Sequence, residues 1–358
     1  MRVVTDAGMI LKQLGVLTKL APSDSGNVSL EVGKNLKLYS LNGLANFQSI
    51  VPCDQIEGEA EFSVNIEAFK TLLRNRGKVE LQYVNTMLVI SEKGYKAELV
   101  TTDPVESQSY KNLSNEKIQG KVWTISADQG QWLQKACKKV QLRVVEALSP
   151  FMPLTVNVTS KGAFLACYDN NHMAFLRDKE TTGDIDFTMP AETLISVLDS
   201  FLKSSYVIEV GDQVMEIRSK LLKVRMNLPN ADSYLPVGEL ISLANKTLKQ
   251  EKQFIKVDCD RLVNFMDSCS AVATKERSEL KIKANGKKLL LSVKTIAGNV
   301  NQTLPLEQPC SCEFSLDFLY LQEAIQKAKA EFIEIGVIKD SSVIVGANNA
   351  HTIISVFD

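Results

Sequence analysis

Side chains that could carry out catalysis are scarce in this sequence. It contains two histidines, His172 and His351, far apart along the chain. There is no G-x-x-x-x-G-K-[ST] phosphate loop, no G-x-S-x-G nucleophile elbow, no H-E-x-x-H helix and no acidic cluster of the two-metal type. We therefore expect a protein that is not an enzyme, with no catalytic residues and no cofactor.

The seven cysteines do not favour a metal site either. Their number is odd and no C-x-x-C pair occurs, which suits buried, reduced thiols better than a disulfide framework. Cys310 and Cys312 are the only close pair, and tetrahedral zinc needs four ligands with usually wider spacing within a pair. We expect no bound metal.

Basic residues show a more informative spacing. Lys135, Lys139 and Arg143 are four residues apart, with Lys138 beside them. On a helix such residues share one face, and like charges there cost about 0.2–0.5 kcal/mol per pair. A polyanion would offset this cost, so the face is a candidate contact with DNA phosphates. A second patch comprises Lys70, Arg74 and Arg76, and Lys12 and Lys19 are weaker candidates.

A plainer interpretation remains open, because a short charge run is usually a solvated helix face. The whole chain has a net charge of −1 at pH 7 and a pI near 6.3, so any DNA-binding surface must be local. In the last third of the chain, Asp258, Asp260 and Asp267 accompany Arg261 on the expected helix. That helix is expected to contribute little binding.

The elements that must position these residues recur three times. Phe62, Phe187 and Phe314 each begin a short strand that leads into an amphipathic helix, and they lie 125 and 127 residues apart. Solenoid repeats have periods of roughly 20–50 residues, so here the repeat unit is a whole domain. Asn65 and Asp317 suit a helix N-cap, whereas Pro190 suits a first helical turn.

Each repeat has the same expected order of helix, strands, helix, strands. The opening helices are expected at 6–20, 127–147 and 258–274, and strands follow at 27–41, 154–168 and 279–294. After the second helix come alternating strand pairs at 78–101, 206–228 and 331–357. Helices segregated from antiparallel hairpins indicate an α+β fold in which two helices cover antiparallel sheets in each domain.

The chain is long enough for several cores, because single cores stop growing at roughly 250–300 residues. We expect three domains, at 1–120, 121–240 and 241–358, with linkers near 103–121 and 235–253. The N-terminal stretch lacks a signal-peptide layout, and no run approaches the roughly 18 apolar residues of a membrane span. We expect a soluble, cytoplasmic protein without a membrane partner.

Nearly the whole chain resembles the β subunit of bacterial DNA polymerase III, the DNA sliding clamp, in its triplicated order of elements and in two stretches. VRMNLPNADSYLPV (224–237) is similar to a family stretch that ends in phenylalanine-proline-aspartate-tyrosine and a further proline. ACYDNNHMA (166–174) is similar to the family's alanine-threonine-aspartate-glycine-histidine-arginine-leucine-alanine, with Asp169 and His172 matching in kind. The chain departs from it by an extra asparagine, by the missing glycine and by Met173 in place of arginine. These departures favour a diverged member, of the kind a bacterial virus encodes.

The resemblance implies a function and an assembly. Family members form a head-to-tail homodimer, a pseudo-sixfold ring that encircles double-stranded DNA without sequence specificity at the replication fork. They tether the replicative DNA polymerase and are handled by a clamp loader. A seam between the 78–90 region and 279–294 would close such a ring by pairing exposed strand edges.

The resemblance also implies a hydrophobic pocket for partner peptides. By residue matching it would comprise Phe151, Met152, His172, Met173, Ala174, Pro236, Val343, Ile354, Val356 and Phe357. Methionine and aliphatic side chains suit such a groove because they adapt to the guest. The alternative for each residue is ordinary core, and for His172 a structural role. An alternative for the whole chain is a clamp-fold scaffold or transcription accessory that binds a polymerase without sliding.

Overall fold

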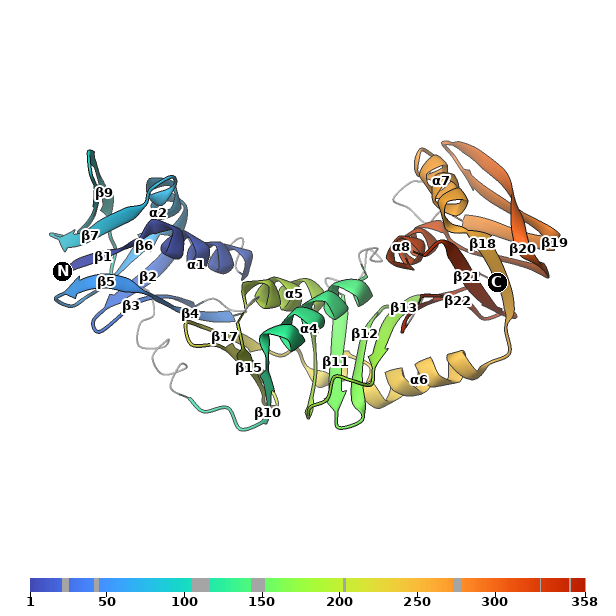
Figure 1. Cartoon of the computed structure of the whole chain (residues 1–358), viewed down its shortest axis with the longest axis horizontal. Coiled ribbons are helices and arrows are strands. Elements are labelled where there is room, and N and C mark those ends of the chain that lie inside the picture. The colour runs from blue at the N-terminus through green and yellow to red at the C-terminus, as the bar shows by residue number, and fades with distance from the viewer. Residues whose placement is uncertain are drawn as a thin grey trace. The chain divides into compact units, whose positions relative to one another are not determined.

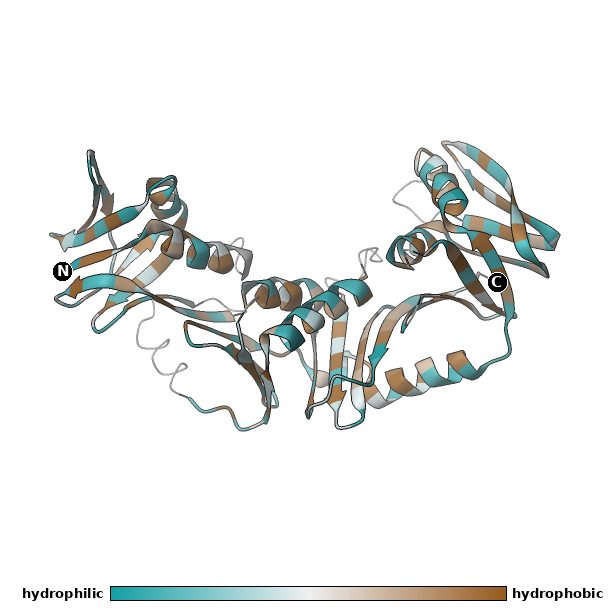
Figure 2. Ribbon diagram, viewed as in Figure 1, coloured by the Kyte–Doolittle hydropathy of each residue, from teal (hydrophilic) through white to brown (hydrophobic). Residues whose placement is uncertain are grey.

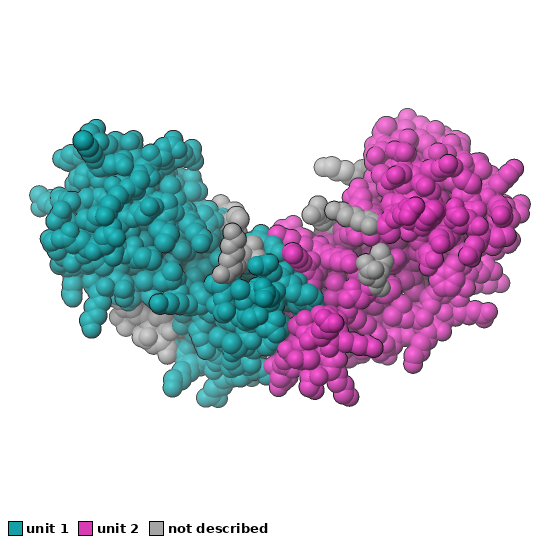
Figure 3. Space-filling view, in the orientation of Figure 1, with its two compact units in different colours: residues 1–134, 193–229 teal, residues 135–192, 230–358 magenta. Residues whose placement is uncertain are grey.

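The computed structural model describes residues 1–20, 26–41, 45–104, 116–142, 152–201, 204–272, 279–328, 330–347 and 349–357. The chain divides into two compact units, residues 1–134 with 193–229 and residues 135–192 with 230–358 (Figure 3). None of the described helices combines the length and apolar composition needed to span a bilayer.

One order of elements occurs three times (Figure 1). The first set is β1 (Arg2–Asp6), α1 (Ala7–Leu20), β2 (Asn27–Val32), β3 (Leu36–Leu41), β4 (Ala45–Val51), β5 (Cys53–Glu57), β6 (Ala60–Asn65), α2 (Ile66–Leu73), β7 (Lys78–Val84), β8 (Met87–Glu92) and β9 (Tyr95–Val100). The second is β10 (Lys121–Ile125), α4 (Ala127–Val140), β11 (Pro153–Thr159), β12 (Gly162–Tyr168), β13 (His172–Asp178), β14 (Ile185–Pro190), α5 (Ala191–Ser200), β15 (Tyr206–Val210), β16 (Val214–Arg218) and β17 (Leu222–Asn227). The third is β18 (Gln253–Asp258), α7 (Cys259–Ser270), β19 (Glu279–Thr295), β20 (Gly298–Asp317), α8 (Phe318–Ala328), β21 (Phe332–Ile338), β22 (Ser342–Ala347) and β23 (Ala350–Ser355). The expected α+β repeat of helix, strands, helix, strands is confirmed.

The first unit contains two antiparallel sheets. One has the strand order β5-β1-β7-β8-β9, and the other has the order β10-β15-β16-β17-β4-β3-β2-β6. The larger sheet joins strands of the first and second sets, because β17 pairs with β4 and places Val224 opposite Phe47. Helices α1 and α2 pack together, and Gln134 of α4 donates a hydrogen bond to Asp199 of α5.

The second unit repeats this arrangement with later strands. Its larger sheet has the order β14-β11-β12-β13-β23-β22-β21-β18, and β13 pairs with β23 so that Met173 lies opposite Ile353. A separate long hairpin consists of β19 and β20, along which apolar and polar side chains alternate (Figure 2). Helices α7 and α8 pack together over a shared hydrophobic core. In both units, therefore, one sheet is shared by two successive sets of elements.

Local sequence explains where several helices begin. The Asn65 side chain accepts a hydrogen bond from the Ala68 N–H at 3.0 Å, and Asp317 accepts one from the Leu319 N–H at 2.9 Å. These N-caps satisfy backbone donors that the first helical turn leaves without partners, as expected from the sequence. Pro190 ends β14, so α5 begins one residue later than expected.

The segment expected as a linker at 235–253 contains a helix, α6 (Val237–Lys249), preceded by a 3₁₀ turn at Ala231–Ser233. Its buried residues are Leu240, Ala244 and Thr247, spaced as one helical face. The sequence analysis did not predict this helix, because Pro236 and Gly238 are more typical of loops. The proline instead forms the N-cap, where its missing N–H costs nothing.

A buried ion cluster stabilises β16 and β17 in the first unit. The Glu216 carboxylate lies 3.0 Å from Nη2 of Arg225, 3.0 Å from Nζ of Lys223 and 2.9 Å from Nη1 of Arg218. Glu216 and Arg225 are 2% and 6% exposed. Arg225 also donates to the Glu116 carbonyl oxygen at 2.5 Å, so the cluster fixes the chain that leads into β10.

Gly162, in the turn between β11 and β12, provides a test of backbone geometry. Its φ is +128°, and a Cβ there would lie 2.4 Å from the Asp178 carbonyl oxygen. We expect Gly162→Ala to lower the free energy of unfolding by about 3 kcal/mol, through unfavourable φ and a clash with backbone that cannot move aside. Denaturant unfolding measures this.

Gly94 is the matched control, because its φ is +79° but nothing lies within 4 Å of the added Cβ. Gly94→Ala should cost only the conformational term, about 1–2 kcal/mol. Equal costs for the two variants would show that the backbone near Asp178 relaxes.

Candidate functional site

The cationic face expected between residues 135 and 143 lies on α4. Lys135 and Lys138 are exposed and Lys139 is half-buried. The opposite face of the helix is buried and includes Leu133 and Val140. The helix ends at Val140, and Arg143 lies outside the described residues. The structure therefore brings three of the four predicted cations together on one helix.

Two cations of the second predicted patch, Lys70 and Arg76, contact other side chains of the first unit. Lys70 forms an ion pair with Glu67 at 2.8 Å, and Arg76 lies 3.6 Å above the Tyr95 ring centroid. Arg74, which caps the end of α2, is exposed. On α1, Lys12 is exposed, and the side chain of Lys19 lies outside the described residues.

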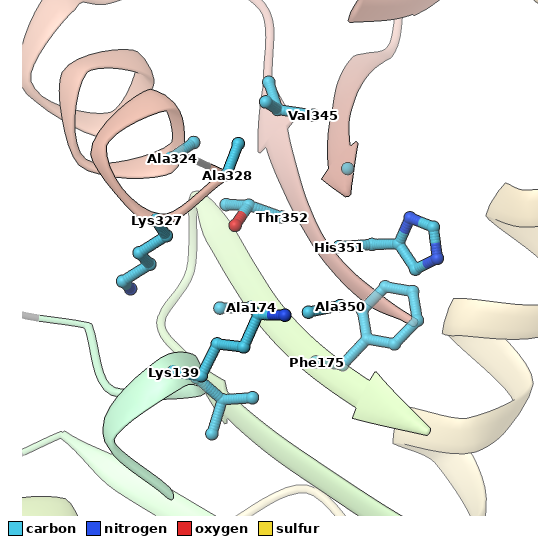
Figure 4. A pocket seen from close by; sticks show the side chains of 12 residues that line it. Lys139, Ala174, Phe175, Ala324, Lys327, Ala328, Val345, Ala350, His351 and Thr352 are labelled. Atoms are coloured by element: carbon cyan, nitrogen blue, oxygen red, sulfur yellow. The ribbon is translucent and has the colours of Figure 1, made fainter. Parts of the chain in front are cut away.

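Figure 4 shows a small pocket in the second unit to which two lysines contribute. Lys139 reaches it from α4 and Lys327 from α8, with Ala174 of β13 and Thr352 of β23 on its walls. Its volume is about 20 Å³, enough for one water-sized group. Lys327 is also paired with Glu323 at 2.9 Å. Sequence analysis missed Lys327, although a basic residue in the last turn of a repeat helix was visible.

His351 borders the same pocket without adding charge. Burial lowers the pKa of its imidazole, and Arg177, Lys139 and Lys252 lower it further. The ring packs against Phe175 with centroids 5.3 Å apart. His351 is thus neutral at neutral pH, and the positive charge of the pocket comes from its lysines.

Three residues of the predicted peptide pocket meet in the second unit, but they are buried. His172 pairs with Ile354 between β13 and β23, and Ile354 pairs with Val343 between β23 and β22. His172 is 3% exposed, and Ile354 and Val343 are 0% exposed. The remaining buried members are Met152, Met173 and Ala174. These side chains are therefore part of the buried core.

His172 has a structural environment. Its Nδ1 lies 2.8 Å from Oδ1 of Asp169, which also accepts from the His172 backbone N–H at 2.8 Å. The imidazole stacks on Tyr320 with ring centroids 3.9 Å apart. Such packing fixes the turn between β12 and β13 and buries the imidazole.

Two other predicted residues, Val356 and Phe357, line an open pocket of about 790 Å³. The Phe357 N–H donates to the Ser315 carbonyl oxygen at 2.7 Å, which holds the C-terminal segment along β20. Phe314 and Ile338 complete the apolar wall. The rim is polar: Glu251, Lys252, Gln253, Glu313, Lys339 and Asp340. Sequence analysis missed Phe314 and Ile338 here, because only strand packing brings them beside the C-terminal segment.

Pro236, another predicted peptide contact, lies apart from the open pocket's lining residues. Pro236 is exposed at the start of α6, and the exposed side chains of Leu235 and Leu243 add apolar surface there. The Leu235 N–H donates to the Tyr168 hydroxyl at 2.8 Å, which attaches this segment to β12. Phe151 lies outside the described residues.

Comparison with known proteins finds a match in structure but none in sequence. No family model matches the sequence, and no curated protein matches it. The DNA polymerase III subunit beta of Pseudomonas aeruginosa aligns with a TM-score of 0.83 and 12% identity over 100% of both chains. The beta subunit of Thermotoga maritima gives 0.81 and 14%, covering 100% of this chain and 99% of that one. The Helicobacter pylori beta clamp bound to a DNA ligase peptide gives 0.77 and 14%, with the same coverage. The chain therefore has the fold of bacterial sliding clamps, as the resemblance indicated.

Proposed function

We propose that this protein is a DNA sliding clamp, a non-enzymatic processivity factor that acts in the cytoplasm at the replication fork. The observation that carries the proposal is the full-length likeness to sliding clamps, which includes the threefold order of elements. The three domains would span 1–120, 121–240 and 241–358. Two chains would close head to tail into a ring around double-stranded DNA.

The way in which the sheets are shared supports closure. Strand β17 of the second set pairs with β4 of the first, and β23 of the third pairs with β13 of the second. By the same rule, β9 of the first set would pair with the 298–305 part of β20 in another copy. Unpaired edge strands are ready templates for such pairing. The seam expected at 78–90 is wrong in this respect, because β7 and β8 already have partners on both sides.

DNA would be held by phosphate contacts alone, which allows sliding. The proposed contacts are Lys12, Lys19, Lys70, Arg74, Arg76, Lys135, Lys138, Lys139 and Arg143. The pocket in Figure 4 adds Lys327 to this set. The α4 cations are the principal candidates, since Lys135 and Lys138 are exposed and lie with Lys139 on one helix.

Partner proteins, namely the replicative polymerase and the clamp loader, would dock through short peptides. The Helicobacter pylori clamp was solved with a DNA ligase peptide, which supports this mode for the fold. In this chain Val356 and Phe357, which line the open pocket, and Pro236 beside α6 are the accessible members of the predicted set. The other described members of the predicted set, Met152, His172, Met173, Ala174, Val343 and Ile354, are buried.

Retention on closed DNA tests the proposal. We expect the protein, loaded on nicked circular duplex by a clamp loader, to stay bound through gel filtration and to be released when the circle is cut. A ring has no other way to leave a circle, whereas ordinary binding is indifferent to linearisation. Equal retention on circular and linear DNA would favour instead a clamp-fold scaffold that binds a polymerase without sliding.

A further inference from the structure

Two cysteines on β20 form a thiol pair that no part of the proposed clamp function uses. The Sγ atoms of Cys310 and Cys312 lie 3.7 Å apart. Both residues are half-buried, and Cys312 lines the open pocket beside Phe314. Residues two apart on a strand point to the same face, which is why the sulfurs are neighbours.

The backbone holds this pair in place. Cys312 pairs with Ala284 and Cys310 with Gly286 across the β19–β20 hairpin. Residues 306–309 bulge out of the ladder immediately before Cys310, since the next paired residue in that direction is Pro305. A ligand of the two sulfurs would meet side chains on an ordered hairpin and would not have to order a loop, which reduces the cost of binding.

The spacing of Cys310 and Cys312 disfavours a disulfide between them. Alternate residues of a strand are about 6.6 Å apart, near the upper limit of about 6.8 Å for Cα atoms joined by a disulfide. A reactive nucleophile is also disfavoured, because burial and the neighbouring Cys310 raise the pKa of the Cys312 thiol to about 12. A single metal ion can bridge the sulfurs more easily, since two metal–thiolate bonds of about 2.3 Å form a linear unit once the sulfurs open from 3.7 Å to about 4.6 Å.

The ligand count selects the metal. Among the described residues no group of three or more histidine, cysteine or acidic side chains is placed to hold an ion. Structural zinc takes four protein ligands, and iron–sulfur clusters take four cysteines. A site with two thiolates suits a soft monovalent cation that accepts few ligands, Cu(I). We propose that Cys310 and Cys312 bind one Cu(I) ion as a bis-thiolate site at the edge of the open pocket.

The other cysteines provide controls. Cys137, Cys167, Cys259 and Cys269 are buried, and Cys53 is half-buried like the pair but is not close to a second described cysteine. Exposure alone would therefore make Cys53 as good a ligand as Cys310. Unlike Cys53, whose Sγ lies 3.3 Å from the Val51 carbonyl oxygen, the pair offers two sulfurs to one ion.

The test is an anaerobic titration of the reduced full-length chain with Cu(I) against a coloured Cu(I) chelator. We expect the wild type and Cys53→Ser to take one Cu(I) per chain from the chelator. Cys310→Ser and Cys312→Ser should each weaken binding at least tenfold, with unchanged circular dichroism. Uptake by a Cys310→Ser/Cys312→Ser double variant equal to that of the wild type, or no uptake by the wild type, would overturn the proposal.

X-ray absorption of the copper-loaded wild type gives a second readout that needs no variant. We expect two sulfur neighbours and no nitrogen or oxygen ligand. A first shell with three or more ligands would place the ion elsewhere. Both measurements use the isolated chain without DNA, so their outcome is independent of whether the protein acts as a clamp.

Discussion

Glu216→Gln is expected to lower the free energy of unfolding of the first unit by about 3–5 kcal/mol. The substitution keeps the side-chain volume but removes the negative charge that compensates Arg225, which is itself buried. A buried cation that loses its nearest counter-ion is costly, and the Glu116 carboxylate that remains 3.8 Å from Arg225 belongs to an exposed side chain. An exposed pair, in contrast, contributes about 0–1 kcal/mol. Hydrogen exchange at the amides of β16 and β17, combined with denaturant unfolding, measures the loss locally.

Glu98→Gln on β9 is the matched control, because Glu98 is exposed and pairs with exposed Lys96 at 2.8 Å. Its cost should stay below about 1 kcal/mol. A loss for Glu216→Gln as small as that of Glu98→Gln would mean that water enters the cluster and screens Arg225.

The same carboxylate predicts a pH dependence. Burial acts to raise the pKa of Glu216, but hydrogen bonds from Arg218 and Lys223 outweigh it, so the pKa is lowered in the folded protein. A lowered folded pKa contributes stability that is complete above the unfolded value of about 4.3 and is lost as the pH falls through the folded value. Glu216→Gln should therefore lose less stability than the wild type on acidification below about pH 4.

Lys135→Glu with Lys139→Glu is expected to reduce affinity for duplex DNA of any sequence by tenfold or more at low salt. Each phosphate contact releases condensed counter-ions, so the slope of log affinity against log salt should become shallower by about 2. The effect should not depend on base sequence, because no base edge is read. Fluorescence anisotropy over a salt series provides both quantities.

Lys246→Glu with Lys249→Glu on α6 changes the net charge by the same amount at exposed positions. This control should leave affinity and salt slope close to those of the wild type. Equal losses in the two double variants would show that total charge, and not the α4 face, determines binding. Wild-type behaviour of the α4 variant would remove these lysines from the DNA contact.

Much of the fold could be predicted because its signals are local. Asn65 and Asp317 cap helices as expected, and the turn residues Asn85 and Asp340 both have a φ of +51°. The pairing of β17 with β4 and of β13 with β23 could not be predicted. It joins segments far apart in sequence, and periodicity does not reveal which strand lies beside which.

The candidate sites show the same division. The cations of α4 share a face because helical spacing alone determines it. Lys327 joins Lys139 only through the packing of α8 against the sheet. Apolar residues such as Ile354 and Phe357 have the same pattern in sequence, yet one is core and the other lines an open pocket. Burial depends on the neighbouring strands, which the sequence does not specify locally.

The sharing of sheets between successive sets of elements has a consequence for fragments of this protein. The second set, cut from the chain, would lose the partner of β17 at one side and the partner of β13 at the other. It would expose two unpaired edge strands, each able to pair with the other in a second copy. Such a head-to-tail contact does not close on itself and so grows without limit. An isolated second set should accordingly assemble into fibres, whereas both of these edges are paired in the whole chain.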